Sequence, residues 1–387
     1  MKYRLILTAL PALLFCGCER LELHPHASQE REAFISVERV ARLLSTVPLE
    51  NDHLREVHDA ATQSARNGYD EEYRMRDLFD APGTGVGAVA PSKAEVYSHP
   101  LRDALREAFL ATKSAAAEDP VWLDSLALSD VQIYWPYSEN WDGKQMPVIT
   151  YDPGDGVTEN EGFLLLADGT VKKVLVDEQM ACERPVWVVN RNSDAEYKTL
   201  ELRRREDPNW GNGGGDILVK SPDPYEKPEL EFRTLVLRSF KAHRQYDSWL
   251  AGASEFFVKL GALEEFIAST EAELRLYDPA ITDFMIVVRR SQVGKELPFN
   301  AILVSEWSDQ LSSCALMMIE DDGGTRTSWK CSAMVKIESK SYGFELEIPL
   351  HSRDDIVWRG SLTTNFIERN SGKTVRFGDV ELVLELI

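Results

Sequence analysis

The sequence lacks the short motifs that mark the common enzyme classes. It contains no His-Glu-x-x-His zinc helix, no Gly-x-Ser-x-Gly turn, no Cys-x-x-Cys pair and no Walker loop. Gly83, Gly85 and Gly87 are spaced wrongly for a dinucleotide-binding loop and follow no predicted strand, so this stretch is interpreted as a linker. Because no pair among the 64 acidic residues stands out, a non-catalytic protein is favoured, and a hydrolase acting on envelope or dietary polymers is the alternative.

Basic residues are outnumbered by acidic ones. The chain has 43 lysines and arginines against 64 aspartates and glutamates, which gives a formal net charge of −21 at pH 7. Such a surface repels a phosphate backbone, so we expect no nucleic-acid partner. The same charge argues against electrostatic docking on anionic lipid.

Long apolar runs are also missing, apart from one at residues 5–15. That run follows Lys2 and Arg4, and it has only about half of the roughly twenty residues that a membrane-spanning helix needs. A basic start, a short apolar stretch and a small residue before the cleavage point are typical of a secretory signal. We therefore predict that residues 1–17 form a signal peptide.

Cys18 follows the small Gly17 directly, as in the lipobox of bacterial lipoproteins, whose cysteine is acylated and becomes the new N-terminus. Phe15 stands where that motif usually has leucine, and an ordinary cleaved signal is the alternative. Several acyl chains together hold a protein firmly on a bilayer. We expect Cys18 to carry lipid such as palmitate, residues 18–34 to form a tether, and the protein to lie on the periplasmic or surface face of the outer membrane of the cell envelope.

Cysteines are few, and after the leader and the lipid site only Cys182, Cys314 and Cys331 remain. Asp322-Gly323 is a strong hairpin signal, and a two-residue turn there would place Cys314 directly opposite Cys331, in a non-hydrogen-bonded pair where side chains lie closest. In an exported protein this predicts a disulfide. Two buried free thiols, or a different strand register, are the alternatives, and we expect Cys182 to be unpaired and buried.

The rest of the chain divides into a helical part and strand-rich parts. Apolar residues at helical spacing predict helices over residues 35–127, and β-rich runs with an Asp168-Gly169 turn predict a small β module over 128–191. A Gly- and Pro-rich connector over 192–228 follows. Short strands at regular spacing over 229–387 fit an antiparallel β-sandwich. The predicted fold class is therefore α+β and multidomain.

Aromatic residues concentrate in one segment of the predicted β module. Tyr134, Trp135, Tyr137 and Trp141 lie within eight positions of one another, and exposed aromatic faces of this kind bind sugar rings. We expect these four residues to be candidate ligand-binding residues for a glycan. The alternative is that they close the core of a small module that has little other mass.

Acidic residues cluster in predicted loops. Asp321 and Asp322 form one cluster and Asp354 and Asp355 another, and both clusters are placed to meet at one end of a sandwich. Calcium needs several carboxylate and carbonyl oxygens converging from loops, so these four residues are candidate ligands for a calcium ion. The spacing matches no EF-hand, and aspartate is also an ordinary turn residue. No other cofactor is expected.

Four segments of the sequence carry a resemblance to a known family: residues 134–143, 281–288, 320–337 and 352–360. They resemble a family of uncharacterised lipoproteins from Bacteroidetes, over most of the mature chain. The resemblance implies export and lipid anchoring, and it adds no catalytic residue. We therefore expect a lipid-anchored envelope protein that binds a glycan or an envelope protein, or serves a structural role.

Overall fold

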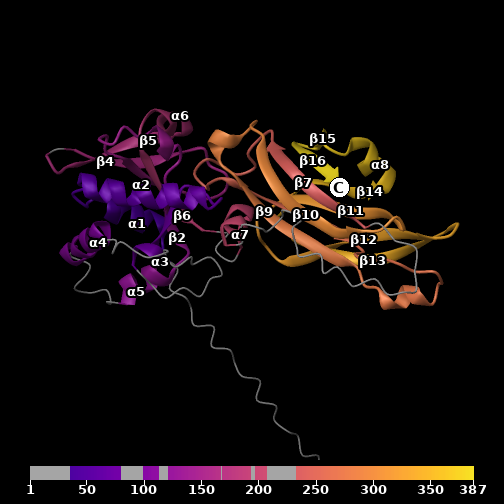
Figure 1. The fold of residues 1–387 in the computed structure, drawn as a ribbon. Coiled ribbons are helices and arrows are strands. Elements are labelled where there is room, and N and C mark those ends of the chain that lie inside the picture. The colour runs from indigo at the N-terminus through magenta and orange to yellow at the C-terminus, as the bar shows by residue number, and fades with distance from the viewer. Residues whose placement is uncertain (1–34, 80–98, 113–120, 167, 193–196, 207–231) are drawn as a thin grey trace, which may run out of the picture. The chain divides into compact units, whose positions relative to one another are not determined.

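The computed structural model describes residues 35–79, 99–112, 121–166, 168–192, 197–206 and 232–387. Residues Ile35–Ile387 form one compact unit. The predicted signal peptide, Cys18 and the tether lie outside the described residues, as do the Gly83–Gly87 stretch and most of the predicted connector. Within the described ranges the fold is mixed α/β, with helices mainly in the N-terminal part and strands dominating the C-terminal part (Figure 1).

The N-terminal part begins with the predicted helices. They are α1 (Val37–Leu44), α2 (Asn51–Arg66), α3 (Met75–Leu78), α4 (Pro100–Ala111) and α5 (Val121–Leu128). The side chain of Ser36 caps α1, and Pro100 occupies the first turn of α4, where its missing N–H costs nothing. Glu50 and His53 form a reciprocal capping box at the start of α2. None of the described helices is long and apolar enough to cross a bilayer.

Six strands of the N-terminal part form one sheet in the order β1-β2-β6-β3-β4-β5. They are β1 (Glu72–Arg74), β2 (Val131–Tyr134), β3 (Val148–Tyr151), β4 (Glu159–Leu165), β5 (Val171–Asp177) and β6 (Val186–Arg191). Neighbouring strands are antiparallel except β3 and β6, which are parallel. The predicted hairpin around Asp168 and Gly169 joins β4 to β5, and Gly169 has a positive φ of 81°.

Helices and sheet of this part share one apolar core. Val40, Leu54 and Leu105 come from three helices, and Trp135 and Trp187 come from the sheet or its edge; all five side chains are buried in the same cluster. Strand β1, in a segment expected to be helical, pairs with β2. The boundary predicted near residue 128 therefore does not divide the packing.

Two short helices follow within or after the sheet, α6 (Glu178–Glu183) and α7 (Leu200–Glu206). Helix α7 lies inside the segment predicted to be an unstructured connector. Thr199, which precedes it, bridges to Met285, and Leu202 is buried in the core of the C-terminal strands. This part of the connector prediction is wrong, because the β-bridge of Thr199, the buried Leu202 and a hydrogen bond from Arg205 to Asn67 hold the helix against residues distant in the sequence.

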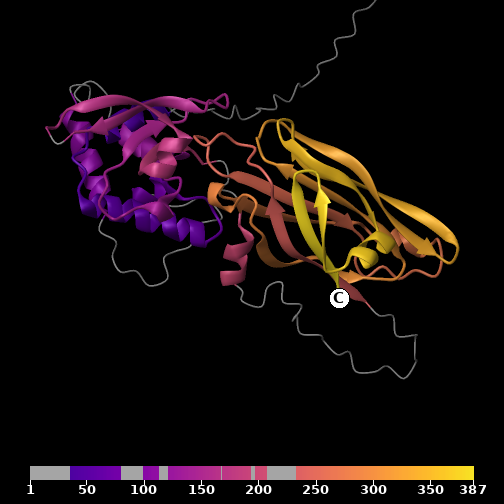
Figure 2. The same ribbon diagram turned by 90° about the horizontal axis from the view of Figure 1, so that it is seen from above.

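The C-terminal part contains two further sheets, shown from above in Figure 2. One has the order β10-β7-β16-β15, and the other β13-β12-β11-β8-β9, with β14 also paired to β11. The elements are β7 (Arg233–Ala242), β8 (Ser254–Ala262), β9 (Ala280–Val288), β10 (Leu297–Trp307), β11 (Leu311–Glu320), β12 (Arg326–Ile337), β13 (Lys340–His351), β14 (Asp355–Thr363), α8 (Thr364–Asn370), β15 (Lys373–Phe377) and β16 (Val380–Leu386). One apolar cluster includes buried residues of both sheets.

The expected register of β11 and β12 is wrong. The register pairs between these strands involve Leu311 and Ser313 of β11, after which β14 lies beside β11 from Ser313 to Glu320. Strand β12 pairs instead along its whole length with β13. The Asp322-Gly323 turn therefore does not close a two-residue hairpin, because a strand from later in the chain takes the place beside β11.

The predicted disulfide does not form in this arrangement. Cys314 lies opposite Leu362 of β14, and Cys331 lies opposite Leu346 of β13. Both cysteines are free thiols, as is Cys182. Cys182 is exposed rather than buried as expected, because it lies on the outer side of the short helix α6.

Candidate cation site and the loop that supports it

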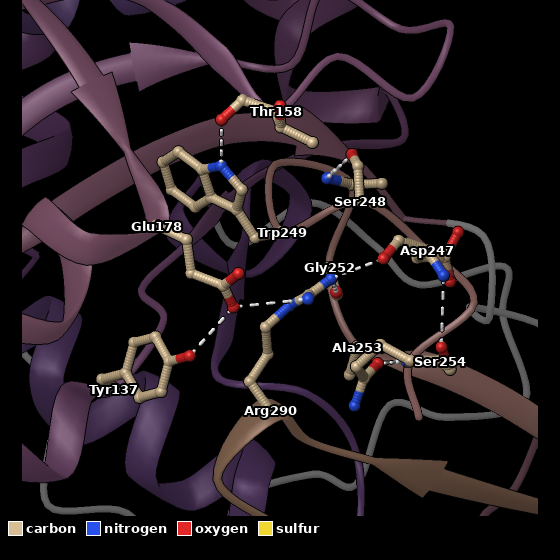
Figure 3. A network of polar contacts seen from close by, with 12 residues as sticks. Tyr137, Thr158, Glu178, Asp247, Ser248, Trp249, Gly252, Ala253, Ser254 and Arg290 are labelled. Carbon is tan, nitrogen blue, oxygen red and sulfur yellow. Dashed lines mark hydrogen bonds and ion pairs between the residues drawn. The ribbon is translucent and has the colours of Figure 1, made fainter. Parts of the chain in front are cut away.

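The segment between β7 and β8, residues 243–253, is called the hub loop here. Its backbone is fixed by hydrogen bonds: the amides of Tyr246 and Asp247 donate to Ser254 Oγ at 2.8 and 3.3 Å, and the amide of Ser254 donates to Gln245 Oε1 at 2.9 Å. Gly252 has a φ of 136°, a conformation that favours glycine. These contacts fix Asp247 beside the first residues of β8 (Figure 3).

Three carboxyl groups meet at this point and are called the carboxylate triad: Asp247 of the hub loop, Glu255 of β8 and Glu320 of β11. One carboxylate oxygen from each lies within 4.8 Å of the others. The strand register explains the meeting, since Glu320 pairs with Phe256, the neighbour of Glu255, where β11 ends and β8 begins. Sequence positions far apart are thus brought to one end of the sheet.

Glu320 is the unusual member of the triad. Its side chain is fully buried, neither of its carboxylate oxygens accepts a well-formed hydrogen bond, and the nearby Ser254 side chain offsets only part of the rise in its pKa. Burial raises the pKa of Glu320 to about 11, and the nearby acids Asp247 and Asp322 add to the shift. Burial likewise raises the pKa of Asp247 to about 6. A buried carboxyl without a donor is costly, so this site requires either a retained proton or a positive ion.

Arg290, whose charge acts on Asp247, forms hydrogen bonds with the backbone of the hub loop. Arg290 donates through Nη2 to the carbonyl oxygens of Asp247 at 2.7 Å and Gly252 at 3.2 Å, and its Nη1 pairs with Glu178 at 3.4 Å. The guanidinium therefore ties the backbone of the hub loop to α6 (Figure 3). Its hydrogen bonds do not reach the carboxylate oxygens of the triad.

A second acidic group lies just beyond β11. Single ligand atoms of Asp321, His351 and Asp354 lie within 4.8 Å of one another. His351 Nδ1 is 3.3 Å from Asp321 Oδ1, the amide of His351 donates to Asp354 Oδ2 at 2.6 Å, and the amide of Gly323 donates to Asp321 Oδ1 at 2.9 Å. These contacts use one oxygen of each carboxylate, and Asp354 Oδ1 is buried without a hydrogen-bond partner but lies 3.8 Å from His351 Nδ1. Because His351 lies beside both acids, this group stabilises a turn and is the weaker candidate for a cation.

The four acids predicted as calcium ligands do come together at one end of the sheet. Asp321 and Asp354 share the contacts with His351, and Asp355 lies opposite Glu320 in the register of β11 and β14. Burial raises the pKa of Asp322, and the nearby Asp355 adds to the shift. The stronger candidate, however, is the neighbouring carboxylate triad, because both oxygens of its buried Glu320 lack a well-formed hydrogen bond.

The members of the triad that sequence reasoning missed are Asp247 and Glu255. Asp247 lies in a loop without any motif, and Glu255 is a single acid at the start of an apolar strand. The available signal for the site is an acid at the start of one apolar strand, Glu255, together with an acid at the end of another, Glu320. It becomes informative only when the pairing of β8 with β11 is known.

The predicted aromatic platform for a glycan is not present. The side chains of Tyr134 and Trp135 are buried, with 0 and 1% of their surface exposed. Trp135 packs edge-on against Trp187 and Trp141, and Tyr137 donates to Glu178 at 3.0 Å. The aromatics therefore mainly fill the cores of the N-terminal part, and the expectation that Tyr134 and Trp135 contact a sugar is wrong.

Comparison with known proteins does not assign the chain to a family. No protein-family model matches the chain, and no match is found among curated proteins or solved structures. The carboxylate triad and the hub loop are therefore the features that bear on function.

Proposed function

We propose that this chain is a lipid-anchored protein of the cell envelope that acts as a non-catalytic binding or structural module and depends on a calcium ion. The observation that carries the proposal concerns Glu320, which is fully buried, has no well-formed hydrogen bond on either oxygen, and lies with two further carboxyl groups whose oxygens are within 4.8 Å of one another. A divalent cation would supply a partner for the oxygens of Glu320 and displace the proton that this carboxyl otherwise retains.

Calcium fits the donor set better than magnesium or zinc. All three side chains of the triad offer carboxylate oxygens, from one loop and two strand ends. Calcium accepts six to eight oxygen ligands in a flexible geometry, with carbonyls and waters completing the shell, whereas magnesium demands a strict octahedron and zinc prefers nitrogen and sulfur. Asp247, Glu255 and Glu320 would hold the ion, and its effect would be structural.

The strand-rich part is proposed to be a β-sandwich that presents the binding surface. Support comes from the single apolar cluster that includes residues of both C-terminal sheets. Tyr134 and Trp135 are buried and cannot stack on a sugar ring. We therefore propose a protein of the envelope, rather than a glycan, as the partner. The anchor is proposed to be lipid on Cys18, as the leader pattern predicts.

The calcium proposal is tested by thermal unfolding of the chain from Glu19, which contains the whole compact unit. Wild type, Glu320→Gln and the control Glu345→Gln, an exposed acid on β13, are compared in calcium and in EDTA. A ligand at a hundred times its dissociation constant stabilises by about 2.7 kcal/mol, a rise of a few degrees in Tm. We expect the rise in wild type and in the control, and its loss in Glu320→Gln; equal Tm values for wild type in calcium and EDTA would contradict the proposal.

The anchor is tested separately in the native cell. A clickable palmitate analogue should label the full-length chain, and Cys18→Ala should abolish both the label and the recovery of the protein in the membrane fraction. Unchanged membrane recovery of an unlabelled chain would refute acylation.

A further inference from the structure

The hub loop connects the carboxylate triad to the N-terminal sheet. Trp249 donates through Nε1 to the carbonyl oxygen of Thr158 at 2.7 Å, and the side-chain amide of Asn190 donates to the carbonyl oxygen of Ala251 at 2.6 Å. Trp249 and Leu250 are buried in a cluster with Tyr134, Val148 and Val188 of the N-terminal sheet. The tip of the loop thus belongs to the core of one part of the molecule while its base belongs to the other.

The end of the hub loop is tied to the same side. The amide of Ala253 donates to Asp70 Oδ2 at 2.8 Å, and Asp70 is itself buried with 3% of its surface exposed. Arg290 joins the carbonyl oxygens of Asp247 and Gly252 to Glu178, which also accepts from Tyr137 (Figure 3). Asp247, two residues before Trp249, is the point at which this network meets the triad.

We propose that a cation bound by the carboxylate triad holds the hub loop in place and thereby regulates the docking of the N-terminal sheet on the C-terminal strands. This inference rests on the proposed function, because it concerns the same site. Without the ion, the side chain of Asp247 loses the bond that links it through the cation to Glu255 and Glu320, and the hub loop is held less firmly at this point. Since Trp249 and Asn190 hold the same short loop, this change loosens their contacts with the N-terminal sheet.

The coupling must act in both directions. If the ion strengthens docking, then weaker docking must weaken ion binding by the same factor, and coupling of this kind typically changes affinity by about 5- to 150-fold. Trp249→Phe keeps an apolar ring in the cluster and removes the hydrogen bond to Thr158. We expect this variant, which changes no ligand of the ion, to bind calcium at least about five-fold more weakly than wild type.

The experiment combines calorimetric calcium titration with hydrogen–deuterium exchange of the chain from Glu19. Calcium, compared with EDTA, should slow amide exchange in residues 248–253 and 186–191, and it should leave the β12–β13 turn at residues 337–340 unchanged. Glu345→Gln serves as the matched control for the titrations of wild type and Trp249→Phe. Wild type alone suffices for the exchange experiment, so it does not depend on the folding of any variant.

The outcomes separate the two proposals. No calcium binding by wild type overturns the proposed function, and the coupling with it. Calcium binding with unchanged exchange in residues 248–253 and 186–191 overturns only the coupling. An unchanged dissociation constant in Trp249→Phe also overturns the coupling, because reciprocity would then fail.

Discussion

Three consecutive acids, Asp70, Glu71 and Glu72, are buried, with 3, 2 and 7% of their surface exposed. Each has a polar contact to a residue distant in sequence: Asp70 accepts from Ala253, Glu71 is 3.9 Å from Arg289, and Glu72 accepts from Asn192. Burial raises the pKa of Glu71 to about 10, and the neighbouring Asp70 and Glu139 carboxyls add to the shift. At the residue scale, the folded protein therefore retains a proton that the unfolded chain releases.

This retained proton predicts how stability depends on pH. Between the ordinary carboxyl pKa near 4.5 and the folded value near 10, the folded state binds one more proton than the unfolded state. The free energy of unfolding therefore falls as pH rises through this range, by at most about 1.4 kcal/mol per pH unit from this group. Glu71→Gln, which mimics the protonated form, should flatten the profile in urea denaturation between pH 5 and 9 in EDTA. The same slope in wild type and variant would count against a protonated Glu71.

The cysteines give a second prediction at this scale. Cys182 is exposed, whereas Cys314 is fully buried, and burial raises the pKa of its thiol to about 12. Because the thiolate is the reactive form, an alkylating reagent at pH 8 should label Cys182 in the native protein and reach Cys314 only on unfolding. Mass spectrometry without reduction should find all three thiols of residues 182, 314 and 331 available after denaturation. A mass two protons lower with two thiols missing would restore the disulfide that the sequence predicted.

The sequence could not reveal the buried acids, for a physical reason. A run of acids next to a predicted helix ordinarily lies on a solvated surface, because an unpaired buried charge is costly. The partners that make burial tolerable here, Ala253 and Asn192, lie 183 and 120 positions away. Local periodicity carries no information about such partners.

At the scale of elements, the β12–β13 hairpin is the clearest case of a turn without its usual residues. Ile337 pairs with Lys340, so Glu338 and Ser339 form the two-residue loop, and Glu338 has a φ of 53°. Two-residue turns with a positive φ at this position favour Asn, Asp or Gly. Asp322-Gly323 has those residues and predicted a hairpin there, so the predicted register of β11 and β12 and the predicted pairing of Cys314 with Cys331 are wrong.

Relief of this backbone strain gives a prediction for the hairpin. Glu338→Gly should stabilise the protein by up to about 1 kcal/mol, because glycine adopts a positive φ without steric cost, although its more flexible unfolded chain offsets part of the gain. Glu338→Asn should act in the same direction with a smaller entropic offset. Urea unfolding at pH 7 measures both, and a loss of stability in both variants would contradict the assignment of this turn.

At the scale of the whole molecule, the predicted division into helix-rich and strand-rich parts is confirmed where the hydrophobic pattern extends over many residues. Helical spacing predicted helices over residues 35–127, where α1, α2 and α4 lie, and regularly spaced strand-like runs predicted the strand-rich part over residues 229–387. Strand β1 and helix α7 escaped because each is short and is held by partners elsewhere in the chain, β2 for the one and Met285 for the other. The carboxylate triad escaped for the same reason, since it forms only where β8, β11 and the hub loop meet.

The carboxylate triad is connected to both parts of the molecule through Asp247. The side chain of Asp247 is part of the triad and its carbonyl oxygen accepts a hydrogen bond from Arg290, and the loop that carries it is buried in the N-terminal part through Trp249. An ion at this point would therefore act on contacts well beyond its own ligands. Any such effect begins with occupancy of the triad.

The most direct measurement is diffraction from crystals grown with calcium, with terbium as a heavier substitute for locating the ion. The account predicts an anomalous peak among Asp247, Glu255 and Glu320, with oxygen ligands at about 2.3–2.6 Å for calcium. Crystals of Glu320→Gln should lack the peak. A wild-type structure at millimolar calcium with no peak in the triad, or with a peak only at Asp321 and Asp354, would contradict the central claim.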